Sequence, residues 1–153
     1  MVFGGFEDFG DEDDDDSGGD GGIMGTSLAG QLAATIADPG ADQFSADDQQ
    51  FIKFHGIYQQ DDRDERGAGG VDAEGKKKKS YIFMVRTKMP GGKLTSNQLM
   101  AELDLADEVG NTTLRCTTRQ GLQLHGVVKH NLKRTIRRIN DIQLSTLGAC
   151  GDV

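Results

Sequence analysis

A short segment in the C-terminal half of the chain carries the side chains best suited to binding an anion. Arg115 and Arg119 lie four positions apart in the run LRCTTRQ, and His125 follows in QLHGV. A guanidinium offers several N–H donors in a fixed fork that matches the oxygens of carboxylates and phosphates. Two such groups beside a histidine predict a site for a polyanionic ligand.

Strand geometry decides how far these two arginines can reach together. Successive residues of a strand point to opposite faces, so a strand over residues 113–118 places Arg115 and Arg119 on the same side. At a rise of roughly 3.3 Å per residue, their α-carbons would stand about 13 Å apart. That spacing favours a wide multivalent anion over a single phosphate. His125 reaches the same surface if the register of the next strand allows.

Two other interpretations of these residues remain open from spacing alone. The arginines could be solvent-facing residues of an antiparallel sheet, paired with carboxylates of a neighbouring helix. His125 could be a structural histidine whose ring nitrogens are satisfied by hydrogen bonds.

Arg86 belongs to another predicted strand and shares the phase of Ile82 and Met84, so a cationic end follows an apolar stretch. This pattern also favours an anion at the end of a sheet.

The elements that position these residues begin at about residue 80. An apolar strand over 81–89 ends at Pro90-Gly91-Gly92. A helix then begins at a capping box of Thr95 and Gln98 and closes at Gly110. Strands over 113–118 and 122–128 and a basic amphipathic helix follow. The residues expected to face the core are Leu99, Leu103, Ala106 and Val109 in the first helix, Leu122, Leu124 and Val128 in the last strand, and Leu132, Ile136, Ile139 and Ile142 in the second helix.

The order β-α-β-β-α predicts an α+β fold, a half domain of ferredoxin-like type, over residues 80–147. A single sheet covered on one side by two helices exposes the face that bears Arg86, Arg115 and Arg119, unless another body packs there.

The preceding residues divide into three stretches. Residues 1–25 are rich in glycine and aspartate, with nine acidic and no basic side chains up to residue 24, and predict a disordered acidic tail. Residues 26–66 predict two short helices, one carrying Leu28, Leu32 and Ile36 and one capped by Ser45 with Asp48. The following segment HGIYQQDDRD is too polar for a core strand and is expected to lie extended over a larger body. Residues 67–79 predict a flexible glycine- and lysine-rich loop.

Charge and composition narrow the classes of partner. Residues 80–140 carry ten basic and four acidic side chains, which indicates an anionic ligand or an acidic partner. The lysines of residues 76–79 lack interleaved aromatic residues, so we interpret them as solvated rather than as a nucleic-acid site. The sequence has no apolar run long enough for a membrane span and no secretory signal at its start. We expect a cytoplasmic protein, or a plastid protein if the source is a photosynthetic eukaryote.

Two cysteines lie far apart in sequence, so neither a disulfide framework nor a zinc site is predicted. Cys116 is most simply a small apolar residue within a strand.

Four separated motifs together resemble a known family. They are KFHGIYQQDDRD, FMVRTKMPGG, the run LRCTTRQ with its following HGV, and LGACGDV. In this order they are similar to the amino-terminal part of the assimilatory sulfite reductase haemoprotein, from the nitrite/sulfite reductase family. The resemblance covers residues 28–153, and the last of them, 148–153, would begin the region that follows the half domain.

The resemblance implies a function and roles for four residues. It implies an enzyme that reduces sulfite to sulfide with six electrons in sulfate assimilation, using sirohaem and a [4Fe–4S] cluster. By this likeness Arg115, Arg119 and His125 contact the sirohaem, which bears eight carboxylates, and Arg86 binds the oxygens of sulfite as the catalytic residue. Ferredoxin or an NADPH-dependent flavoprotein would donate the electrons.

The chain departs from the family pattern in one respect that affects activity. The cluster cysteines of the family lie beyond Val153, and neither cysteine of this chain matches them, so we expect no metal ligand here and an inactive fragment in the absence of the C-terminal half. The alternatives are a nitrite reductase of the same family or a non-catalytic module that binds an anion or an acidic protein. The segment HGIYQQDDRD favours sulfite over nitrite.

Overall fold

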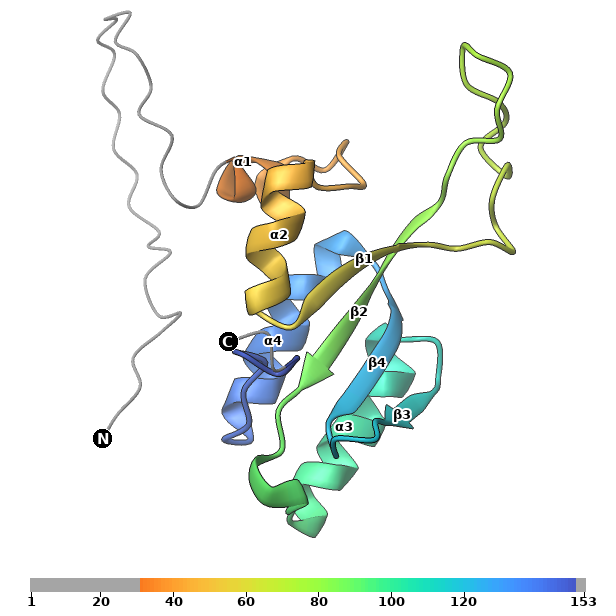
Figure 1. The fold of residues 1–153 in the computed structure, drawn as a ribbon. Coiled ribbons are helices and arrows are strands. Elements are labelled where there is room, and N and C mark those ends of the chain that lie inside the picture. Colours follow the sequence, from red (N-terminus) through yellow and green to blue (C-terminus); the bar gives the residue numbers. More distant parts are fainter. Residues whose placement is uncertain (1–30, 151–153) are drawn as a thin grey trace, which may run out of the picture.

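A four-stranded antiparallel sheet in the order β1-β2-β4-β3 organises the chain, with the helices on one of its faces (Figure 1). The computed structural model describes residues 31–150. The strands are β1 (Ile57–Asp61), β2 (Tyr81–Thr87), β3 (Leu114–Cys116) and β4 (Leu122–Val127). The helices are α1 (Leu32–Ala37), α2 (Ala46–Phe54), α3 (Ser96–Val109) and α4 (Leu132–Asp141), with 3-10 turns at Pro90–Gly92 and Lys129–Asn131.

The predicted α+β fold is confirmed, because β2, α3, β3, β4 and α4 follow one another in the expected β-α-β-β-α order. β4 lies beside β2, so these two strands form the centre of the sheet, and β3 forms one edge. The other edge is β1, which the sequence did not predict.

Residues 57–61 of the segment HGIYQQDDRD are extended, as expected, and they also form an edge strand of the sheet, which was not predicted. β1 pairs with β2 from Ile57 opposite Val85 to Asp61 opposite Tyr81. Ile57 is buried, and the Gln59 side chain is used structurally, since its Oε1 accepts a hydrogen bond of 2.6 Å from the Phe44 amide. An edge strand tolerates such polar residues because only part of its surface is covered.

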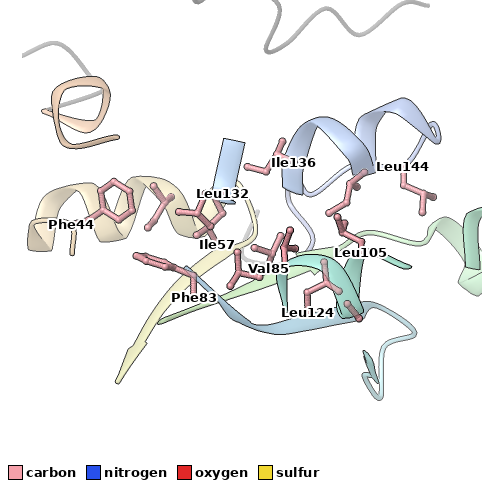
Figure 2. Packing of buried hydrophobic residues seen from close by; sticks show 14 of the residues in the cluster. Phe44, Ile57, Phe83, Val85, Leu105, Leu124, Leu132, Ile136 and Leu144 are labelled. Carbon is pink, nitrogen blue, oxygen red and sulfur yellow. The ribbon is translucent and has the colours of Figure 1, made fainter. Parts of the chain in front are cut away.

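The core lies between the sheet and the helices (Figure 2). Phe83, Val85, Leu124 and Val127 contribute fully buried side chains from the central strands. Phe44 packs edge-on against Phe83, with ring centroids 5.5 Å apart. At about 25 cal/mol per Å² of apolar surface, this layer supplies the main driving force for folding.

Helix α3 begins at the predicted capping box, but its buried face differs from the prediction. The Thr95 hydroxyl accepts from the Gln98 amide, and the Gln98 side chain accepts from the Thr95 amide. Leu99 and Leu103 are both 41% exposed and not in the core. The buried residues are Glu102, Leu105, Ala106 and Val109. Ala106 and Val109 are therefore buried as predicted, whereas Glu102 and Leu105 are buried in place of Leu99 and Leu103.

β4 contains a bulge that shifts its last core residue. Leu124 pairs with Val85 and Val127 pairs with Phe83, so two residues of β4 oppose one residue of β2. Gly126 lies in this bulge with φ +77°. Val127 is consequently the buried residue, and the predicted Val128 is only half-buried. Bulges break the two-residue alternation on which the prediction depended.

Lys129 joins α1 to the rest of the fold. Its side chain is 8% exposed, and its ammonium donates hydrogen bonds to the carbonyls of Thr35 and Asp38 at the C-terminal end of α1. Ser45 caps α2 by accepting from the Asp48 amide, as predicted. Leu28 and the predicted acidic tail lie outside the described residues.

Residues 62–80 form a long connection between β1 and β2 that projects from the body of the structure (Figure 1). Within it Val71 forms an isolated bridge with Lys77. Within residues 31–150, no helix is long and apolar enough to cross a membrane.

Candidate functional site

The register of the sheet places Arg86 and Arg115 in one row on the face opposite the helices. Arg86 on β2 pairs with Gln123 on β4, and Gln123 pairs in turn with Arg115 on β3. Residues paired in register project from the same face. The row thus carries two guanidinium groups with one amide between them.

Arg86 contacts its neighbours on both sides. Its guanidinium lies over the Tyr58 ring of β1, 5.6 Å from the centroid. With the Gln123 amide oxygen turned toward it, Arg86 donates to that oxygen from Nε at 3.0 Å and from Nη2 at 2.6 Å. These contacts hold the guanidinium against the sheet and leave the remaining N–H donors for a ligand.

His125 lies beside this row. Its Nε2 is 3.3 Å from the amide head of Gln123. Burial lowers the pKa of His125, and the positive charges of Arg115 and Arg86 lower that pKa further. The imidazole is therefore held in its neutral form at neutral pH, within the electrostatic field of both arginines.

Arg119 does not extend the strand as predicted. β3 ends at Cys116, and residues 117–121 form a tight hairpin turn in which the Thr117 amide donates to the Gly121 carbonyl at 2.8 Å. Gln120 has φ +64° in this turn. The turn ends the strand alternation, so the expected spacing of Arg115 and Arg119 along one strand is wrong. Arg119 instead donates to the backbone carbonyl of Cys150.

Among residues 31–150, no ion pair joins Arg86, Arg115 or Arg119 to a carboxylate. The helix carboxylate that could have paired with them, Glu108, instead binds Arg134 at 2.5 Å and Arg138 at 3.1 Å on α4. The alternative in which the arginines of the sheet are paired with helix carboxylates is therefore wrong in this fold.

Neither cysteine belongs to a group of metal-ligating side chains among residues 31–150. Cys116 is exposed, Cys150 is buried, and both are free thiols. Within residues 31–150, no three His, Cys, Asp or Glu side chains are grouped to hold a metal ion.

Sequence reasoning missed two members of the site. Tyr58 was not considered because β1 was not predicted as a strand, and Gln123 was not singled out because only its register with both arginines reveals its position. An alternating strand pattern through Gln123 and His125 was the available signal for the second residue.

Residues 74–142 match the family described as the nitrite/sulfite reductase ferredoxin-like half domain. The chain belongs to the nitrite/sulfite reductase family. It is 48% identical over 126 residues to the sulfite reductase (NADPH) hemoprotein beta-component of Myxococcus xanthus, and 46% identical over 129 residues to that of Geobacillus kaustophilus. Each alignment covers 82% of this chain and 22% of the relative.

The fold of this nitrite/sulfite reductase family member is also seen in a solved structure. The NirA protein of Mycobacterium tuberculosis matches with a TM-score of 0.58 and 23% identity, over 76% of this chain and 22% of that one. The likeness supports the same fold. The chain thus spans about a fifth of the length of the relatives it matches, and the predicted family is confirmed.

Proposed function

We propose that this chain is the amino-terminal part of a sirohaem and [4Fe–4S] sulfite reductase, and that the sheet face bearing Arg86 and Arg115 binds the cofactor and sulfite. The observation that supports this most directly is the row in which Arg86, Gln123 and Arg115 share one face, with neither arginine in an ion pair. Because two cations close together repel each other, such a row favours an anionic ligand.

The residues present fit a carboxylate-rich cofactor. Arg115 is exposed at the edge strand, and its fork geometry suits a carboxylate. Arg119 uses part of its donor set on the Cys150 carbonyl and keeps other N–H groups for a second carboxylate. A neutral His125 adds hydrogen-bonding capacity without adding another charge. These three residues are our proposed cofactor contacts.

Arg86 is our proposed sulfite-binding residue. Its guanidinium is supported by Tyr58 and Gln123, so it is oriented before any ligand arrives. A preorganised cation lowers the free energy of charge that develops on substrate oxygens as S–O bonds weaken. The cofactor, when bound, would supply the electrons for the reduction of sulfite to sulfide.

The remaining functions belong to sequence outside this chain. The relatives are named hemoprotein components of an NADPH-dependent reductase, and the chain covers 22% of them. We therefore assign the cluster ligands and the contact with the electron donor, a flavoprotein or ferredoxin, to the other parts of the enzyme. On this proposal the present chain alone is inactive.

A binding titration tests the cofactor assignment. We would titrate the chain with uroporphyrin, which carries eight carboxylates, and with deuteroporphyrin, which carries two, following tetrapyrrole fluorescence. Uroporphyrin should bind more tightly, and Arg115→Ala should weaken it about tenfold, equivalent to about 1.4 kcal/mol. The control is Arg137→Ala on the exposed face of α4. Equal affinity in the two variants would contradict the assignment.

A further inference from the structure

Gln123 occupies an unusual position for an uncharged amide. Only 7% of its surface is exposed, and its register partners on the two flanking strands are both arginines. Its amide head also lies next to His125. Three potential donors therefore surround one side chain that has a single acceptor oxygen.

The hydrogen-bonding chemistry fixes the orientation of this amide. Arg86 presents only N–H donors, so the amide oxygen must face it to form hydrogen bonds at 3.0 Å from Nε and 2.6 Å from Nη2. The amide nitrogen then takes the position next to His125, 3.3 Å from Nε2. An amide nitrogen can only donate, so His125 Nε2 must be the acceptor. The ring proton then resides on Nδ1.

We propose that Gln123 is a positioning residue that couples the protonation of His125 to the orientation of Arg86. While His125 is neutral, the amide donates to its Nε2 and offers the oxygen to Arg86. When His125 gains a proton at Nε2, that atom becomes a donor, and the amide must turn its oxygen toward the imidazolium. Its NH2 group then faces the Arg86 guanidinium, and both hydrogen bonds to Arg86 are lost.

The surroundings of the imidazole support the neutral state as the resting one. Among the described residues, the charged groups that face it are Arg115 on β3 and Arg86 on β2. Burial is the main cause of its lowered pKa, and both arginines act in the same direction. Burial and the two positive charges therefore oppose the protonation of His125, and the amide turns only after the imidazole has gained its proton.

This inference rests on the proposed function in one respect only, which is the role of Arg86 in binding sulfite. The coupling itself is a property of the chain without cofactor. Failure of tetrapyrrole binding would thus count against the proposed function and leave the coupling untouched.

Nitrogen-detected NMR of the chain tests the coupling directly. In the wild type, the Arg86 Nε–H should exchange slowly with solvent at neutral pH and His125 should show the Nδ1-protonated tautomer. As His125 titrates, exchange at Arg86 Nε–H should accelerate about tenfold, the usual scale for losing a hydrogen bond to a charged group. Exchange that does not change across the His125 titration would overturn the proposal.

Two substitutions separate the halves of the coupling. Gln123→Leu removes both contacts, so Arg86 Nε–H should exchange about tenfold faster at every pH. Gln123→Glu keeps an acceptor for Arg86 but cannot donate to His125, so protection at Arg86 should persist on acidification and the pKa of His125 should rise. Gln60→Leu, on the exposed part of β1, is the matched control. If Gln123→Glu behaves like Gln123→Leu, Gln123 has only a packing role.

Discussion

Arg86 and Arg115 face the same side of the sheet from the two strands that flank β4, and both pair in register with the same residue, Gln123. The two guanidinium groups share one face with an uncharged amide between them, so their charges repel each other when no counter-ion is bound. Within residues 31–150 no carboxylate pairs with either arginine, while Arg134 and Arg138 on α4 share Glu108. We therefore propose that the sheet face binds an anionic ligand, whereas the ion pairs of Glu108 connect the helices α3 and α4.

Arg86→Ala in the complete reductase should weaken sulfite binding far more than it reduces cofactor content. Losing a charge-assisted contact of this kind costs about 1.5–3 kcal/mol, so KM for sulfite should rise at least about tenfold. Parallel assays with nitrite show which anion the site prefers. Lys93→Ala, an exposed cation beyond the end of β2, is the control. Loss of sirohaem with unchanged KM would reverse the role proposed for Arg86.

Gly56→Ala should destabilise the fold because the backbone approaches closely there. Gly56 has φ +73°, and a Cβ would lie 2.6 Å from the Thr146 carbonyl oxygen and 2.8 Å from that of Arg86. We expect the free energy of unfolding to fall by about 2–4 kcal/mol, measured by urea denaturation.

Gly70→Ala is the matched control for this effect. Its φ of +88° imposes similar backbone strain, but a Cβ would meet nothing within 4 Å. Its cost should be about 1 kcal/mol. Equal losses in the two variants would show that backbone strain alone, rather than the close approach of the Thr146 and Arg86 carbonyls, makes glycine necessary at residue 56.

Glu102 should make the chain less stable as the pH rises. It is fully buried, neither carboxylate oxygen has a hydrogen bond of ordinary geometry, and burial raises its pKa above the ordinary 4.5, with the Thr87 hydroxyl opposing that shift. The folded chain therefore keeps a proton that the unfolded chain releases. This stabilisation is fully present below pH 4.5 and is lost as the pH rises through the folded pKa.

Glu102→Gln should abolish that loss. The difference in unfolding free energy between variant and wild type should grow in favour of the variant from pH 4.5 upward and then level off. Asp104→Asn, exposed on the same helix, should follow the wild type. A constant difference across the pH range would mean that Glu102 has the same pKa in the folded and the unfolded chain.

Lys129→Met should loosen α1. The substitution removes the ammonium that donates to the Thr35 and Asp38 carbonyls, and these carbonyls then lose charge-assisted hydrogen bonds. We expect a loss of about 1.5–3 kcal/mol and faster hydrogen exchange in residues 32–38. Lys133→Met, exposed on α4, should change neither quantity. Unchanged exchange in α1 would show that other contacts hold this helix.

Local signals predicted the helices and their order. Ser45 at α2 and the Thr95–Gln98 capping box at α3 specify helix starts through hydrogen bonds within a few residues, and both are present as expected. The side of α3 that is buried depends on its neighbours instead. The helical spacing of apolar residues favoured burial of Leu103, so it could not predict that Glu102 is buried next to Thr87.

Non-local pairing decided the parts that sequence could not predict. β1 is polar and becomes a strand only because β2 offers an edge, and the bulge at Gly126 moves Val127 into the core. For the site, strand alternation placed Arg86 and Arg115 on one face correctly, since both lie in regular strands. It failed for Arg119, because the turn after Cys116 is set by hydrogen bonds of Thr117 with Gly121.

The sirohaem content of the complete reductase carrying Arg115→Ala tests the central claim most directly. Visible absorption per protein, compared with wild type and with Arg137→Ala on α4, reports whether the sheet face holds the cofactor. We predict that Arg115→Ala loses most of its sirohaem while Arg137→Ala retains the wild-type amount. Full sirohaem content in a folded Arg115→Ala protein would contradict the assignment of this cationic row to the cofactor.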